Sequence, residues 1–122
     1  MSELDALVQK GLPKESLERT LRTVYSERGE YKEFRAQVIP IATLKRRGAK
    51  LSTIESERTE RLARVTAMAL ETWNGEEEGT REWLRAPHKE LGGVAPMQAA
   101  LTELGARRVE KILMTIFYGL PA

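Results

Sequence analysis

Apolar residues recur every three or four positions along most of this 122-residue chain. This spacing is typical of α-helices that bury one face and expose the other. Valine, isoleucine and threonine do not alternate with polar residues over any long run, so no β-strand is expected. The pattern therefore predicts an all-α protein of about seven or eight helices.

The first helices of the chain are expected to be short. Leu4, Leu7 and Val8 predict a helix that ends near Gly11. Pro13 suits the first turn of the next helix. Backbone N–H groups in a first turn have no partner within the helix, so the missing N–H of proline costs little there. This second helix carries one apolar stripe, which is expected to be buried and consists of Leu17, Leu21, Val24 and Tyr25.

The segment from Tyr31 to Lys50 has the layout of a helix-turn-helix. A short helix with Tyr31 and Phe34 stops at Pro40, and a strongly basic helical segment, residues 41–47, follows it. In such a motif the second helix lies in the major groove of DNA. The side chains expected to contact DNA are hydroxyl or cationic: Thr43, Lys45, Arg46, Arg47 and Lys50. The same pattern also fits a basic, solvated helix in a plain bundle, and the residues alone do not choose between the two.

A long helix is expected to begin after Ser52 and to end near Asn74. Ser52 and Glu55 form the capping box S-x-x-E, which marks a helix N-terminus. Arg61 and Arg64 each follow a glutamate by four residues, so both are expected on the solvent-exposed side. The opposite side is expected to be buried and carries Leu62, Val65, Ala69 and Trp73.

Three more helices are expected in the rest of the chain. One runs through Trp83 and ends before Pro87, and Pro96 opens the next, which Gly105 is expected to end. Trp83 and Phe117 fall at helical spacings, so burial in the core is the expected role of both. The last helix is expected to present a single apolar face, made of Val109, Ile112, Leu113, Ile116 and Phe117, and to end at Gly119.

Composition adds a charge asymmetry to this picture. Residues 1–51 carry eleven Lys and Arg against seven Asp and Glu, whereas residues 52–122 carry nine against eleven. A basic first half indicates an anionic partner such as nucleic acid, although ordinary surface charge would give the same excess of Lys and Arg. The absence of cysteine excludes disulfides, thiolate zinc sites and a cysteine nucleophile. No signal peptide and no membrane-spanning run is seen, so a cytoplasmic protein without a membrane partner is expected.

Catalytic chemistry finds little support in the sequence. His88 is the only histidine, and no Asp or Ser stands at a motif spacing from it. The three glutamates Glu76, Glu77 and Glu78 could attract a cation, but a solvated loop that favours the N-terminus of the next helix explains them as well. No nucleotide-binding loop, metalloprotease motif or nucleophile elbow is present. We therefore expect no catalytic residue, no metal site, no cofactor and no enzyme activity.

Residues 52–119 resemble the toxin-binding domain of Xre/MbcA/ParS-type antitoxins. The resemblance rests on four spaced motifs: Trp83-Leu84 with Pro87, Leu91-Gly92-Gly93 with Pro96, Gly105-Ala106 with Val109, and Tyr118-Gly119. Upstream, the stretch VIPIATLKRRGAKLS is similar to the Xre-like helix-turn-helix that precedes this domain. Val38 replaces the usual turn glycine, and Ile41 and Ala42 stand where polar residues usually open the recognition helix. The resemblance implies a helix-turn-helix module in residues 1–51 and a toxin-binding domain in residues 52–122.

The resemblance also implies partners. Such antitoxins are non-catalytic; they bind a RES-domain toxin that consumes NAD, cover its active site, form dimers within a larger complex and repress their own operon. A terminal tail that reaches the toxin's cleft is part of this expectation, although a frayed terminus is the alternative. A DNA-binding transcriptional regulator without a toxin partner is the second functional hypothesis. The expected toxin-binding residues are Lys89, Leu91, Gly92, Gly93, Val94, Tyr118, Gly119, Leu120, Pro121 and Ala122.

Overall fold

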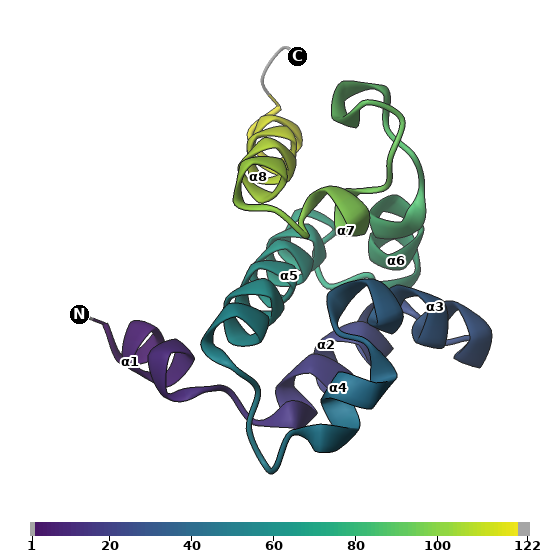
Figure 1. Ribbon diagram of the computed structural model, residues 1–122. Coiled ribbons are helices and arrows are strands. Elements are labelled where there is room, and N and C mark those ends of the chain that lie inside the picture. Colours follow the sequence, from purple (N-terminus) through teal and green to yellow (C-terminus); the bar gives the residue numbers. More distant parts are fainter. Residues whose placement is uncertain (1, 120–122) are drawn as a thin grey trace. The chain divides into compact units, whose positions relative to one another are not determined.

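The computed structural model describes residues 2–119 and confirms the all-α fold (Figure 1). No strand occurs within that range, where the only β-type pairings are two isolated bridges. The elements are, in chain order, α1 Glu3–Lys10, α2 Lys14–Val24, α3 Arg28–Val38, α4 Ile41–Arg46, α5 Thr53–Thr72, α6 Glu77–Arg85, the 3-10 turn η1 Lys89–Leu91, α7 Pro96–Ala99 and α8 Glu103–Phe117.

The chain divides into two compact units, Met1–Glu60 and Arg61–Ala122. The division falls inside α5, so the long helix belongs to the first unit at its start and to the second unit afterwards. The boundary predicted after residue 51, between a helix-turn-helix module and a toxin-binding domain, stays a prediction. Each unit has its own buried side chains.

The core of the first unit is built on the predicted stripe of α2. Leu17, Leu21, Val24 and Tyr25 are all buried, as their spacing predicted. The ring of Tyr25 stacks on Phe34 of α3, with 5.0 Å between the ring centroids. These contacts hold α2 against α3, and the pairing positions the short helix α4 that follows.

A turn at Ile39 and Pro40 connects α3 to α4. Ile39 is buried, and its carbonyl oxygen accepts a hydrogen bond of 2.8 Å from the buried Arg35 guanidinium. Pro40 precedes the first residue of α4, where its fixed backbone angle suits a helix start. The turn is therefore fixed on both sides, by a buried side chain and by a proline.

The predicted capping box at the start of α5 is confirmed. The Glu55 N–H donates to the Ser52 hydroxyl at 3.2 Å, and the Ser52 N–H donates to the Glu55 carboxylate at 2.8 Å. The Ser56 hydroxyl accepts a 2.8 Å bond from the Leu12 N–H, which ties the start of α5 to the segment between α1 and α2. Local sequence thus sets the start of the long helix, and a hydrogen bond from a distant segment fixes its position in the first unit.

The second unit buries the expected side of α5 and corrects the expectation for its arginines. Leu62, Val65 and Ala69 are fully buried. Arg61 is only 13% exposed, and its guanidinium donates to the Leu101 carbonyl at 2.9 Å. Arg64 lies 2.7 Å from the Glu110 carboxylate of α8. The two arginines therefore join α5 to the α7–α8 region instead of lying free on a solvated face.

Gly105 does not end a helix, contrary to the prediction. Helix α7 is a single turn that stops at Ala99, and Gly105 is the third residue of α8. The Thr102 hydroxyl caps α8 by accepting a 3.0 Å bond from the Gly105 N–H. A Cβ atom at Gly105 would lie 1.8 Å from the Ala99 carbonyl oxygen. The glycine is needed because α7 and the first turn of α8 approach closely, and not because a helix terminates there.

The predicted single apolar face of α8 is only partly buried. Val109 and Leu113 are in the core together with Ala106, but Ile116 and Phe117 are 46% and 48% exposed. The expectation that Phe117 belongs to the core is therefore wrong. Leu113 is the last buried residue of the helix, so its final turn carries apolar side chains in contact with solvent.

Candidate functional site

A compact loop between α6 and α7 forms one side of the candidate site. The His88 N–H donates to the Val94 carbonyl at 3.0 Å, and the Gly93 N–H donates back to the His88 carbonyl at 2.9 Å. Gly92 and Gly93 have φ values of 69° and 84°, a left-handed conformation that glycine adopts without strain. Leu91 is buried beneath the loop. The loop of residues 88–94 is thus held by its own backbone hydrogen bonds and by one apolar anchor.

Aromatic contacts brace this loop against α5 and α6. The Trp83 ring lies 5.4 Å from Trp73 and 4.8 Å from the His88 ring, measured between ring centroids. Trp83 is half-buried and stands between the other two rings. His88, the only histidine of the chain, therefore packs against Trp83 with its ring tilted by 55° to the indole.

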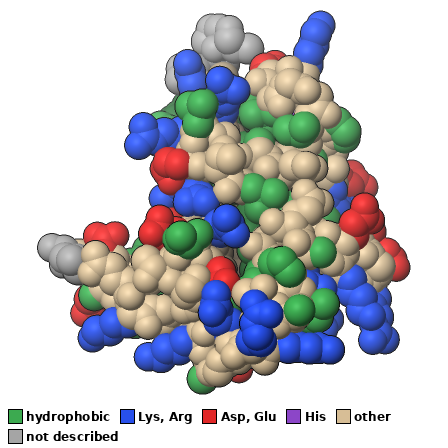
Figure 2. Space-filling view, viewed as in Figure 1, with side chains coloured by type: hydrophobic (Ala, Val, Ile, Leu, Met, Phe, Trp, Pro, Cys, Tyr) green, Lys and Arg blue, Asp and Glu red, His purple; other side chains and the backbone are tan. Residues whose placement is uncertain are grey.

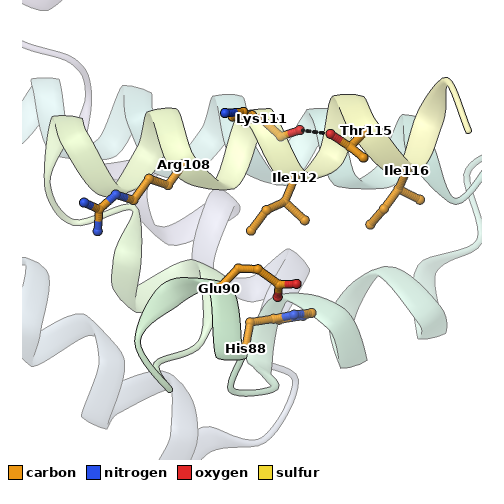
Figure 3. Close-up of a pocket in the computed structure, with 7 residues that line it drawn as sticks. All are labelled: His88, Glu90, Arg108, Lys111, Ile112, Thr115 and Ile116. Atoms are coloured by element: carbon orange, nitrogen blue, oxygen red, sulfur yellow. Dashed lines mark hydrogen bonds between the residues drawn. The ribbon is translucent and has the colours of Figure 1, made fainter. Parts of the chain in front are cut away.

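A groove of about 510 Å³ separates this loop from α8 (Figure 3). His88 and Glu90 line it from the loop. The lining residues from α8 occupy successive turns of one helix side: Arg108, Lys111, Ile112, Thr115 and Ile116. Figure 3 shows Ile112 and Ile116 directed toward the loop, with His88 and Glu90 opposite them. We call this feature the α8 groove.

Next to the α8 groove, the end of α8 exposes four large apolar or aromatic side chains. Met114 is 51% exposed and Tyr118 is 64% exposed, and Ile116 and Phe117 are each exposed over nearly half of their surface. The rings of Phe117 and Tyr118 meet edge to face, with centroids 5.1 Å apart. Apolar surface that is contiguous and exposed in this way is typical of an interaction site. We call these four residues the apolar end of α8.

The structure brings most of the predicted toxin-binding residues near this groove. Lys89, Gly92 and Gly93 are exposed on the loop, whereas Val94 is partly buried and Leu91 supports the loop from below. Tyr118 and Gly119 directly follow α8, and Gly119 has a φ of 64°. The predicted residues Leu120, Pro121 and Ala122 lie outside the described residues.

Sequence reasoning missed the polar wall of the α8 groove. Arg108, Ile112 and Ile116 recur every four residues, and this spacing was a signal that they share one side of α8. The two isoleucines were assigned to the core instead, because the sequence does not indicate where the covering elements end. Glu90 and Lys111 carried no signal beyond their charge.

The acidic side chains of α8 form ion pairs, whereas two of its cationic side chains form none within the described part of the chain. Its acidic residues Glu103 and Glu110 form ion pairs with arginines, Glu103 at 3.9 Å from Arg61 and Glu110 at 2.7 Å from Arg64. Arg108 and Lys111 have no acidic partner among residues 2–119. The side of α8 that faces the groove is therefore cationic, while the negative charge of the helix is used within the unit.

A second candidate surface is basic and lies on the first unit. Figure 2 shows many Lys and Arg side chains over the N-terminal helices. Lys45, Arg46 and Lys50 are exposed, and Thr43 is partly buried with its hydroxyl 3.3 Å from the Arg46 guanidinium. The geometry places α3, a fixed turn and α4 in succession, but α4 has only six residues. The cationic and hydroxyl side chains of this surface remain predicted DNA contacts.

Arg47 differs from its cationic neighbours. Its guanidinium donates two hydrogen bonds to the Glu55 carboxylate, at 2.9 and 2.8 Å. The bond from Arg47 lowers the pKa of Glu55 to about 2, and bonds from Ser52 act in the same direction against the opposing effect of burial. The same pair raises the pKa of Arg47. Arg47 is thus engaged in holding the end of α4 against the start of α5.

The glutamates at 76–78 have a local structural role. The Glu76 carboxylate caps α6 by accepting hydrogen bonds from the backbone N–H groups of Glu78 and Gly79, at 3.0 and 2.6 Å. Within residues 2–119 no group of three or more acidic or histidine side chains is arranged to hold a metal ion. Over the same part of the chain, no helix has the length and apolar character needed to cross a membrane.

The chain is similar to a known protein family and to curated relatives from other organisms. Residues 68–119 match the family described as the antitoxin Xre/MbcA/ParS C-terminal toxin-binding domain. A Pseudomonas putida protein named antitoxin Xre is 40% identical over 88 residues, which are 70% of this chain and 55% of that protein. A Photorhabdus laumondii protein of the same name is 29% identical over 120 residues, 96% of this chain and 80% of that protein. The chain therefore spans little more than half the length of the P. putida relative.

Proposed function

We propose that this chain, which belongs to the Xre/MbcA/ParS-type antitoxins, binds a toxin through its second unit and neutralises it. One observation carries the proposal. The α8 groove and the apolar end of α8 both lie within residues 68–119, the segment that matches the toxin-binding domain of the family. Exposed apolar surface beside a rigid loop favours a protein partner, because burial of apolar area is the main driving force of association.

The proposed partner is a RES-domain toxin that consumes NAD. This choice rests on the resemblance of residues 52–119 and of the preceding basic segment to the antitoxins that accompany such toxins. The antitoxin is proposed to act without chemistry of its own, by covering the active site of the toxin. The segment that follows Gly119 is proposed to reach the cleft of the toxin, since α8 ends at Phe117 and the chain continues beyond Gly119.

Co-expression tests the proposal directly. The proposed toxin is the RES-domain protein that we expect to be encoded beside this chain, and it is expressed from an inducible promoter in cells that do or do not produce the antitoxin. We expect growth arrest with the toxin alone and rescue with the full chain. Failure of the full-length, folded antitoxin to restore growth would contradict the proposal.

A truncated antitoxin tests the role assigned to the terminus. Removal of residues 119–122 leaves α8, the groove and the loop in place. We expect the truncated chain to bind the toxin but to inhibit it less than the full chain does. Equal inhibition by both forms would show that the terminus does not act in the cleft.

Operator binding is the proposed second activity, and it is assigned to the first unit. Two features support it: α3 and α4 are joined by a fixed turn, and Lys45, Arg46 and Lys50 are exposed beside them. The proposed active form is an antitoxin dimer, free or with toxin, that represses the operon. Contacts from these cations to phosphates would supply much of the affinity.

Salt-dependent binding to the promoter measures this activity. Arg46→Ala is expected to weaken binding and to reduce the slope of log K against log salt by about 1, because one phosphate contact is lost. Gln9, on α1, provides a control through Gln9→Ala, which removes no charge. Wild-type protein that shows no salt-dependent binding to its own promoter would remove this second activity from the account.

A further inference from the structure

We propose that the α8 groove receives an apolar segment of the toxin that carries a carboxylate. The inference rests on the proposed antitoxin function and specifies the chemistry of the partner that the groove fits. Three properties of the groove lead to it: an apolar floor, unpaired cations at its wall, and a loop that is already in place.

The floor of the groove is apolar and uncovered. Ile112 and Ile116 point from α8 toward the loop, and Ile116 is 46% exposed (Figure 3). Thr115 presents no free hydroxyl proton to the groove, because it donates to the Lys111 carbonyl at 2.9 Å. A segment that enters the groove therefore meets methyl groups, and apolar side chains are the groups that gain by being buried there.

The wall of the groove adds a specific charge. Arg108 and Lys111 line the groove from α8 without an acidic partner among the described residues, whereas Glu103 and Glu110 are turned to Arg61 and Arg64. Among the described residues, Glu90 is the one acidic side chain that lines the groove, on the loop side. The cations thus outnumber the acid, and a carboxylate on the incoming segment would complement them. A guanidinium or ammonium paired with a carboxylate gains charge-assisted hydrogen bonds in such a place.

The loop that closes the groove is formed before any partner arrives. The paired backbone bonds between His88, Gly93 and Val94 fix its shape, and the tilted ring contact between His88 and Trp83 fixes its position. A preformed loop has little conformational freedom to lose on binding, so more of the contact energy remains as affinity. The groove is therefore suited to seat a segment of a folded partner.

Charge reversal with a matched control tests the proposal. The variant carries Arg108→Glu and Lys111→Glu, and the control carries Arg107→Glu at the adjacent position of α8. The Arg107 side chain is 74% exposed and does not line the groove. Affinity for the proposed RES-domain toxin is measured by calorimetry at low and at high salt, after circular dichroism has verified that all three proteins are equally folded.

We expect the double reversal to weaken toxin binding about tenfold or more at low salt, while Arg107→Glu changes it less than about threefold. High salt should weaken toxin binding by the wild-type protein, because screening reduces the contribution of an ion pair near the surface. The difference in toxin affinity between the wild-type protein and the double variant should therefore become smaller at high salt. Equal affinities of the double variant and the control would overturn the groove proposal and leave the antitoxin function standing. Absence of any toxin binding by the wild-type protein would overturn both.

The single histidine gives an independent readout of groove occupancy. His88 lines the groove and is the only histidine in the chain, so its imidazole gives one set of NMR signals in labelled antitoxin. Addition of unlabelled toxin should shift these signals, and the shift should be lost or reduced in the double variant. Unchanged His88 signals in a formed complex would place the toxin elsewhere. The same shift on raising the antitoxin concentration without toxin would assign the groove to a second copy of this chain and overturn the proposal.

Discussion

At the scale of single residues, Arg47 and Glu55 form the contact with the clearest energetic consequence. Two hydrogen bonds of 2.9 and 2.8 Å join them, and Glu55 also caps α5 through the Ser52 N–H. The carboxylate is nearly buried, with 9% of its side chain exposed. Removal of its charge therefore leaves a guanidinium without its partner, and the capping bond becomes weaker as well.

We expect Glu55→Gln to lower the free energy of unfolding by about 2 kcal/mol at pH 7. Urea unfolding followed by circular dichroism measures this change. Glu57→Gln is the matched control, because Glu57 lies exposed on the same helix and should change stability by less than about 0.5 kcal/mol. Equal stabilities of the two variants would show that the Arg47–Glu55 pair contributes nothing to the fold.

The same pair predicts a pH dependence. The pKa of Glu55 falls from an ordinary value of 4.5 to about 2 in the folded chain. The unfolded chain therefore takes up a proton first as the pH falls, and the stabilisation is complete above about 4.5 and lost toward 2. The difference in stability between wild type and Glu55→Gln should shrink over this range. A difference that stays constant between pH 6 and pH 3, at about its neutral value, would contradict the assignment.

Two glycines offer a contrast that tests the packing of α7 on α8. A Cβ at Gly105 would lie 1.8 Å from the Ala99 carbonyl oxygen, whereas a Cβ at Gly48 would meet no atom within 4 Å. We expect Gly105→Ala to destabilise the chain by more than about 2 kcal/mol and Gly48→Ala to be neutral within about 0.5 kcal/mol. Thermal or urea unfolding of both variants checks the pair. A stable Gly105→Ala protein would mean that the α7–α8 contact is looser than described.

At the scale of elements, α8 has two parts that differ in burial along its length. Its first three turns bury Ala106, Val109 and Leu113, and its last turn exposes Ile116 and Phe117. The apolar spacing identified the helix correctly but could not separate these two parts. Periodicity reports which side of a helix is apolar, whereas burial depends on how far the neighbouring elements extend. Ile116 and Phe117 were therefore grouped with the buried residues of one apolar face.

This division of α8 leads to a prediction with opposite effects at two positions. Leu113→Ala should lower the free energy of unfolding by about 2–5 kcal/mol, because it opens a cavity in the core. Ile116→Ala should leave stability within about 0.5 kcal/mol and weaken toxin binding by more than about 1 kcal/mol. Urea unfolding and calorimetry with the toxin distinguish the two variants. Comparable destabilisation by both would show that Ile116 belongs to the core.

Features that depend on neighbouring residues were predicted correctly from the sequence, whereas features that depend on contacts between distant residues were not. The capping box at Ser52 and Glu55 is local, so the sequence alone located the start of α5. Gly105 was misassigned, because its requirement comes from the approach of Ala99 and not from its own backbone angle. Arg61 and Arg64 were placed on the solvated side because the distant partners Leu101, Glu103 and Glu110 cannot be recognised from spacing.

At the scale of the whole molecule, the two units divide the proposed tasks. The first unit carries the exposed cations Lys45, Arg46 and Lys50, and Arg47 holds α4 in place instead of projecting freely. The second unit carries the α8 groove and the apolar end of α8 within the matched toxin-binding segment. Both surfaces would be used in a complex that binds toxin and operator together. The sequence indicated the two partners through motifs, while the groove between α8 and its loop became visible only in three dimensions.

Inhibition of the toxin in a purified system tests the central claim most directly. The RES-domain protein that we expect to be encoded beside this chain is incubated with NAD, alone and with an equimolar amount of the full-length antitoxin, and the remaining NAD is measured over time. The account predicts rapid loss of NAD with the toxin alone and a stable NAD concentration once the antitoxin is present. Consumption of NAD at the same rate with and without the folded antitoxin would contradict the claim that this chain neutralises such a toxin.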